Sequence, residues 1–215
     1  MLTKHIVEKI DYAIKYAWMH QIADDYNECS ILKEDSLKNS FYHHLRNALD
    51  SLFRENGIRI YTEFNEKGLK SKGLRADIAI VSLGQPKSDN YYLGERIGDV
   101  LAIIELKFKG DGSSGTSAIY QDVDKVKNYI KNFSFPECQY YLGIIHEYSY
   151  SFSELRWLDK RQSNNWGKGR LTELNACYYE EHGENDIGFS VCSYNEFNPE
   201  LNCCNLSNIR FVSME

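Results

Sequence analysis

Two apolar segments decide the fold of this chain, Ala76-Asp-Ile-Ala-Ile-Val81 and Val100-Leu-Ala-Ile-Ile-Glu-Leu-Lys-Phe-Lys109. Both are short, rich in β-branched residues and flanked by turn residues, which predicts two buried strands. Each carries charge where a core strand is normally apolar, because Asp77 opens the first and Glu105 and Lys107 lie inside the second. Burying an unpaired carboxylate is costly, so we expect these groups either to neutralise one another or to hold a cation.

Glu105 and Lys107 are expected to lie on the same face of their strand. Side chains alternate with a period of two along an extended chain. The apolar residues around them therefore point to the opposite face, namely Ile104, Leu106 and Phe108. The second segment thus predicts one face that packs in the core and one face that carries charge.

The composition is that of an ordinary globular protein. The chain has 215 residues, of which 42% are hydrophobic and 26% charged, and this length predicts a single domain over residues 1–215. No apolar run approaches the ~20 residues of a membrane helix, so no membrane contact is expected. The N-terminus lacks the apolar core of a signal peptide, which indicates a cytoplasmic protein. A net charge of −6 argues against a surface that coats nucleic acid nonspecifically, although it leaves room for a local basic groove.

Cysteine and histidine patterns give little indication of a metal site. Six cysteines are scattered without a Cys-x-x-Cys pair, so reduced thiols are expected rather than disulfides. The adjacent Cys203 and Cys204 could recruit zinc only together with histidines from elsewhere in the chain. His43 and His44 follow one another on a predicted helix, where side chains point about 100° apart and do not readily share one ion.

Two helices are predicted before the first strand. Residues 4–25 and 34–55 each carry an apolar stripe at the spacing of one helix face, and Asn56-Gly57 is a stop signal after the second. The stripes consist of Ile6, Ile10, Ala13, Ile14, Ala17 and Ile22, and of Leu37, Phe41, Leu45, Ala48, Leu49 and Leu52. The first helix shows no evident chemistry, whereas the second carries Glu34 in its first turn.

Further strands are predicted at residues 57–64, 139–145, 171–179 and 187–194, and a further helix at 151–165. In the first of these strands one side should be shared by Ile58, Ile60, Thr62 and Phe64. Between the two central strands, residues 82–99 are predicted to form an elongated hairpin loop.

Another helix is predicted after the glycine-rich loop 110–115. Its apolar face, which should pack on the sheet, consists of Ile119, Val123, Val126 and Ile130. The opposite side presents Gln121 and Lys125 one turn apart, where they either reach a ligand at the sheet edge or face solvent.

The order of the predicted helices and strands, together with one sequence motif, resembles the core of the PD-(D/E)xK nuclease superfamily. The motif is Arg75-Ala-Asp77 followed by Ile104-Glu105-Leu-Lys107, with 28 residues from Asp77 to Glu105. The similarity covers roughly residues 32–145. It implies an α/β (mixed α+β) restriction-endonuclease-like core, in which a central mixed β-sheet is flanked by helices in the order α-β-β-β-α-β. An N-terminal helix in residues 1–31 would precede this core, and a C-terminal β extension in residues 146–215 would follow it.

The resemblance implies that Asp77 and Glu105 bind Mg²⁺, for which Mn²⁺ can substitute, with the backbone carbonyl of Leu106 as a third ligand. Phosphodiester hydrolysis needs such residue types, because a hard cation held by oxygen ligands activates water and stabilises charge on the phosphate. Lys107 would orient the water or neutralise the developing charge, and nearby carboxylates favour the second role.

The same resemblance implies two further site residues. Glu34 matches a helical glutamate that often completes the site, which would make it a further ligand of the ion, and Glu63 on the first strand is its competitor. Gln121 resembles a glutamine on the helix after the Glu-x-Lys strand. The chain departs from the family pattern in two places, with Lys125 where an aromatic residue is expected and Ala76 in place of the proline.

These expectations define a metal-dependent nuclease that acts on DNA, with a homodimer implied by the many members that cut two strands. One alternative is a catalytically inactive module of the same fold that binds nucleic acid or a protein partner. Another is that Asp77, Glu105 and Lys107 form a purely structural ion-pair cluster.

Overall fold

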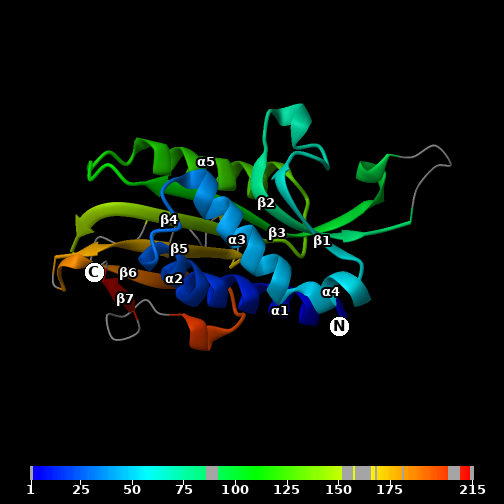
Figure 1. The fold of residues 1–215 in the computed structure, drawn as a ribbon. Helices are drawn as coiled ribbons and strands as arrows, with labels where there is room; N and C mark the ends of the chain where they lie inside the picture. The colour runs from blue at the N-terminus through cyan, green and yellow to red at the C-terminus, as the bar shows by residue number, and fades with distance from the viewer. Residues whose placement is uncertain are drawn as a thin grey trace.

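A computed structural model describes residues 2–85, 92–151, 157, 166–167, 169–180, 182–202 and 209–213. Its strands form one seven-stranded sheet in which spatial order follows chain order (Figure 1). The strands are β1 (Ile58–Phe64), β2 (Ala76–Leu83), β3 (Ile97–Lys109), β4 (Gln139–Tyr150), β5 (Leu171–Tyr179), β6 (Gly183–Ser193) and β7 (Arg210–Ser213). The pairs β3–β4 and β4–β5 are parallel and the other pairs are antiparallel, which confirms the predicted mixed sheet.

The helices cover both faces of this sheet. They are α1 (Leu2–Tyr16), the π-helical turn η1 (Ala17–Ile22), α2 (Ala23–Asn27), α3 (Glu34–Ala48), α4 (Asp50–Glu55) and α5 (Ser117–Asn132). Short 3₁₀ turns occur at η2 (Lys70–Lys72), η3 (Leu93–Arg96) and η6 (Pro199–Leu201). Among the described residues, no helix is long and apolar enough to cross a membrane.

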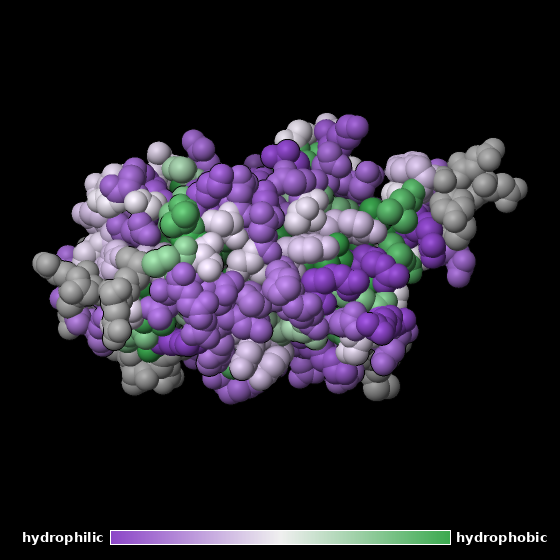
Figure 2. Space-filling model, viewed as in Figure 1, coloured by the Kyte–Doolittle hydropathy of each residue, from purple (hydrophilic) through white to green (hydrophobic). Residues whose placement is uncertain are grey.

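Alternation along β3 separates two apolar cores. Ile104 and Leu106 pack with the helices from α1 to α4, whereas Ile103 packs with α5 on the other face. The face that carries α1 and α3 is covered mainly by hydrophilic residues (Figure 2), as expected for amphipathic helices whose apolar stripes face a sheet. The predicted separation of Glu105 and Lys107 from Leu106 is therefore confirmed.

Gly143 on β4 lets the helical layer approach β3 closely. A Cβ atom at this position would lie 2.7 Å from Cδ2 of Leu106 and 3.2 Å from the ring of Trp18. The absence of a side chain thus seats the indole of η1 against the residue that separates Glu105 from Lys107.

Several predicted elements differ from those observed. The helix expected at 34–55 is interrupted at Leu49, and Ala48, assigned to its buried stripe, is exposed. Strand β6 begins at Gly183 rather than at 187, and β7 was not predicted. Most of the predicted helix 151–165, Cys203, Cys204 and part of the loop 82–99 lie outside the described residues.

The prediction that Phe64 lies on the same side of its strand as Ile58 and Ile60 is wrong. Glu63 has a positive φ of 54°, a left-handed conformation that interrupts the alternation of an extended strand. As a result, Phe64 packs in the core under α5, while Ile58 and Ile60 pack in the core under α3. Thr62, assigned to the same side, is exposed.

A fully buried ion pair lies on α1, where the sequence showed no chemistry. Asp11 and Lys15 are one turn apart, their charged atoms lie 2.8 Å from each other, and both side chains are 0% exposed. Tyr141 of β4 donates a hydrogen bond to Asp11 at 2.8 Å. Burial lowers the pKa of Lys15, although the Asp11 carboxylate opposes this shift.

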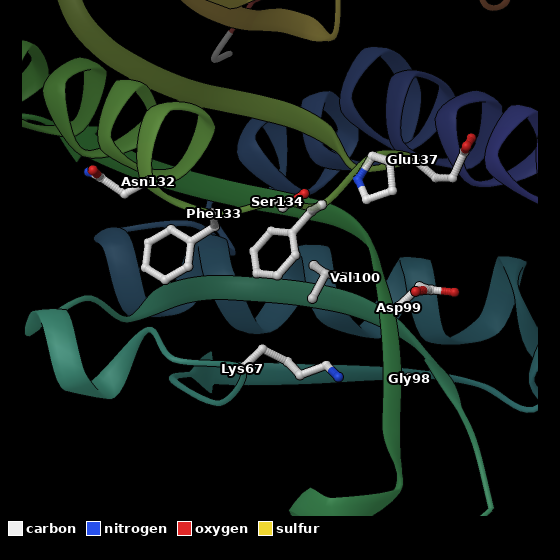
Figure 3. A pocket seen from close by; sticks show the side chains of 10 residues that line it. Lys67, Gly98, Asp99, Val100, Asn132, Phe133, Ser134 and Glu137 are labelled. Atoms are coloured by element: carbon white, nitrogen blue, oxygen red, sulfur yellow. The ribbon is translucent and has the colours of Figure 1, made fainter.

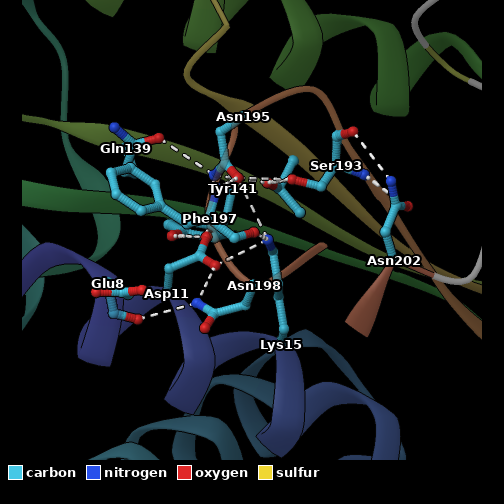
Figure 4. Close-up of polar contacts among 11 residues, drawn as sticks. Glu8, Asp11, Lys15, Gln139, Tyr141, Ser193, Asn195, Phe197, Asn198 and Asn202 are labelled. Carbon is cyan, nitrogen blue, oxygen red and sulfur yellow. Dashed lines mark hydrogen bonds and ion pairs between the residues drawn. The ribbon is translucent and has the colours of Figure 1, made fainter. Parts of the chain in front are cut away.

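The segment after β6 closes this network from the other side (Figure 4). Asn195 and Asn198 each donate an amide hydrogen bond to Asp11, at 2.9 and 2.8 Å, and the Lys15 ammonium donates to the carbonyl of Phe197 at 2.6 Å. We call the pair and these three residues the α1 lock. It attaches the first helix to a segment more than 180 residues later in the chain, as the separation of 184 between Asp11 and Asn195 shows.

We expect Asp11→Ala to destabilise the fold strongly, because it leaves the Lys15 ammonium buried without its carboxylate. Removing one partner of a buried ion pair typically costs about 3–5 kcal/mol, and denaturant titration would measure this loss. Glu196→Ala is the matched control, since Glu196 pairs with Lys4 of the same helix but both side chains are well exposed, at 74% and 65%. That variant should change the free energy of unfolding by less than about 1 kcal/mol. Equal losses in the two variants would contradict the assignment.

Candidate active site

The backbone at Leu106 brings the first two predicted residues together. Asp77, the second residue of β2, accepts a hydrogen bond from the Leu106 amide at 2.9 Å. The amide and carbonyl of one residue in an extended strand point to the same side, so the Leu106 carbonyl also faces β2. Asp77 therefore lies beside the peptide that joins Glu105 to Lys107.

Glu105 is completely buried beneath α5. One carboxylate oxygen pairs with the ammonium of Lys125, and the other accepts a hydrogen bond from the Tyr129 hydroxyl at 2.7 Å. Burial raises the pKa of Glu105 to about 8, and the Asp77 carboxylate adds to this effect, while Lys125 and Tyr129 oppose it. The same surroundings raise the pKa of the Tyr129 hydroxyl, first through burial and then through the Glu105 carboxylate.

Lys107 lies between two helices. Its ammonium is 2.7 Å from the Glu34 carboxylate in the first turn of α3 and 3.3 Å from the Asp122 carboxylate of α5. Burial alone would lower the pKa of Lys107, but Glu34 and Asp122 outweigh it and raise the pKa. Burial raises the pKa of Asp122 despite the attraction of Lys107. Lys107 is therefore protonated over the neutral pH range.

Glu63 is held apart from Lys107. It pairs with Lys38 of α3 and, at 2.6 Å, with Arg75. Hydrogen bonding to Lys38 lowers the pKa of Glu63, and the Asp77 carboxylate contributes to the raised pKa of Lys38. Of the two candidate glutamates, Glu34 is thus the one that contacts Lys107.

Together these side chains form what we call the charged cluster. It consists of Glu34, Glu63, Asp77, Glu105 and Asp122, with Lys38, Arg75, Lys107 and Lys125. Each carboxylate has a cation or a hydrogen-bond donor beside it. With every group ionised, five negative and four positive charges leave a net charge of −1.

Helix α5 contributes more than the sequence indicated. Asp122, Lys125 and Tyr129 are spaced by three and four residues, which places them on one helix face. Asp122 and Tyr129 were not predicted, although this spacing beside the apolar stripe could have identified them. Gln121 is exposed, and no hydrogen bond joins it to Glu105 or Lys107 within the described residues. Tyr129, one turn after Lys125, contacts Glu105 through its hydroxyl hydrogen bond.

The oxygen donors around Leu106 fit a hard divalent cation better than they fit zinc. Carboxylates and a backbone carbonyl are the ligands that Mg²⁺ and Mn²⁺ prefer. Asp77 and Glu105 would hold the ion, and the influence of Asp77 on the pKa of Glu105 indicates that the two carboxylates act on one another. Among the described side chains, no three His, Cys, Asp or Glu residues already converge in a ligand shell.

The histidines and the cysteines that the structure describes do not contribute to this cluster. His43 is exposed, and Nε2 of the half-buried His44 lies 2.9 Å from the Asp25 carboxylate. The cysteines that the structure describes carry free thiols, namely Cys29, Cys138, Cys177 and Cys192.

Two surface cavities among the described residues contain little of the charged cluster. One cavity of about 320 Å³ is lined by Lys67, Gly98, Asp99, Val100 and residues 132–137, with two phenylalanine rings at its wall (Figure 3). Another of about 330 Å³ shares Glu63 with the cluster and is lined largely by Tyr61, Phe64, Tyr92 and Leu93.

Comparisons of the chain with protein-family models, with curated proteins and with solved structures find no match. The charged cluster and its surroundings are therefore the features of the chain that bear on its function.

Glu105 should give the stability an unusual dependence on pH. Its pKa of about 8 in the folded chain exceeds the ~4.3 of an unfolded glutamate. Between these values the folded state keeps a proton that the unfolded state has lost. The contribution of Glu105 is therefore fully present below pH ~4 and falls by up to about 1.4 kcal/mol per pH unit as the pH rises toward 8.

Denaturant titrations over this pH range would measure the effect, and Glu105→Gln should abolish the decline. Glu63→Gln is the control. The pKa of Glu63 is lowered in the folded chain, so its contribution to stability is lost as the pH falls, and this variant should keep the decline at rising pH. Parallel stability curves for the wild type and Glu105→Gln would contradict the raised pKa.

Proposed function

We propose that this chain is a metal-dependent nuclease of the PD-(D/E)xK type, with a restriction-endonuclease-like core that hydrolyses phosphodiester bonds in DNA. The observation that carries the proposal is that Asp77 accepts a hydrogen bond from the amide of Leu106, the residue between Glu105 and Lys107, while Glu34 contacts Lys107. These residues come from α3, β2 and β3, the elements that the sequence motif predicts.

In the proposed mechanism, the residues that bind the ion differ from the residue that stabilises charge on the phosphate. A bound Mg²⁺ or Mn²⁺ would polarise the phosphate and lower the pKa of an attacking water. Asp77, Glu105 and the Leu106 carbonyl would hold the ion. Lys107, kept protonated by Glu34 and Asp122, would stabilise the negative charge that develops on the scissile phosphate. Its protonation favours this role over that of a general base.

The setting of the proposed reaction follows from the same resemblance. We propose a cytoplasmic enzyme in which two copies of the chain pair, so that both strands of a duplex can be cut. The net charge of −6 makes local contacts near the cluster, rather than a general basic surface, the means of holding DNA.

A second candidate is an inactive module that has kept the nuclease fold and binds nucleic acid or a protein. The observation in its favour is the mutual neutralisation within the charged cluster, where the Glu105 carboxylate is already paired with Lys125 and Tyr129. A structural role would need no more than these contacts.

Cleavage of single-stranded, duplex and branched DNA and of RNA, assayed with Mg²⁺ or Mn²⁺, tests the proposal. We expect EDTA to abolish cleavage and Lys107→Met to reduce it by at least about 10²-fold, since it removes a charge that acts in the transition state.

Lys109→Met is the matched control, because Lys109 follows on the same strand and its side chain has the same 20% exposure, yet it contacts Asp111 and Ser113. That variant should retain activity. A folded wild-type protein that cuts no substrate while binding nucleic acid or a partner would support the inactive module instead.

A further inference from the structure

Glu105 has two partners that differ in their freedom to move. Tyr129 is fully buried in the core under α5. The side chain of Lys125 keeps 25% of its surface exposed, so it borders solvent. A lysine also carries a long, flexible stem. The partner that neutralises Glu105 is therefore the one that can leave.

The position of Lys125 conflicts with a second cation on Glu105. In the ion-free chain its ammonium offsets the buried carboxylate, which also feels the charge of Asp77. A divalent ion held by Asp77 and Glu105 would lie within a few ångströms of this ammonium. Like charges at such a distance repel strongly in a buried setting, so both cations cannot stay on Glu105.

We propose that Lys125 is a positioning residue that holds Glu105 in place in the ion-free protein and is exchanged for the divalent ion when the ion binds. This inference rests on the proposed function, because it requires an ion at Asp77 and Glu105. The charges balance when both groups are ionised: the ion replaces the ammonium on the carboxylate, and the ammonium moves into solvent with its proton.

The exchange would give the site two properties. Glu105 stays ordered without an ion, because Lys125 and Tyr129 fix both of its oxygens. Binding of the ion then releases a positive charge at the mouth of the site, where phosphate groups would approach. Lys125 would thus couple ion binding to the capture of the anionic substrate.

Amine labelling of the full chain tests the exchange. The labelling rate of Lys125, followed by peptide mass spectrometry, would be compared with and without Mg²⁺ at one fixed, mildly alkaline pH of about 8.5, at which lysine amines are mostly protonated and an ion pair slows their reaction further. We expect Mg²⁺ to raise this rate roughly tenfold, the factor for losing an interaction of about 1.4 kcal/mol. Lys109, which pairs with Asp111 outside the charged cluster and whose side chain is 20% exposed, should keep its rate.

Glu105→Gln provides the matched variant. Lys125 should react rapidly in this protein without Mg²⁺, and its rate should not respond to the ion. A Lys125 that reacts as slowly as in the wild type would overturn the assignment of Glu105 as its holder.

Calorimetric titration of the same wild-type samples with Mg²⁺ and Mn²⁺ distinguishes a failure of the exchange from a failure of the proposed function. If an ion binds and the rate of Lys125 is unchanged, the exchange is wrong and the metal site stands. If neither ion binds, the proposed function fails, and the exchange fails with it.

Discussion

The buried carboxylate of Glu105 is the constraint on which the arrangement of the candidate site depends. A carboxylate inside a sheet needs hydrogen bonds and positive charge, and α5 supplies both through Tyr129 and Lys125. This requirement fixes which face of α5 lies over β3. The same face then brings Asp122 to Lys107, which Glu34 holds from α3. Charged residues from two helices on opposite faces of the sheet thus meet the same strand.

Local periodicity was enough to predict much of this arrangement. The alternation along β3 placed Glu105 and Lys107 on one face, and the apolar stripe of α5 predicted which side would pack on the sheet. The polar partners on α5 depend on where the helix docks along the strand, which tertiary packing decides. Phe64 shows a second limit, because the positive φ of Glu63 changes the side of the strand without a glycine to indicate it.

The α1 lock could not be predicted from the sequence. Asp11 and Lys15 have the spacing of an ordinary surface pair on a helix, and such pairs are usually solvated. They are buried here because Tyr141, Asn195 and Asn198 supply hydrogen bonds from distant parts of the chain. No local pattern indicates partners at that separation. The charged cluster differs from the lock in this respect, because strands that are neighbours in the sheet supply its central residues.

The α1 lock also has a consequence for the order in which the protein can form during synthesis. Asp11 leaves the ribosome long before Asn195, from which 184 residues separate it. Until that later segment arrives, the ion pair of α1 has no amide or carbonyl partners from it and would be costly to bury. The polar contacts of the first helix to be made would thus be among the last contacts of the protein to form, after its apolar stripe has met α3 and β3.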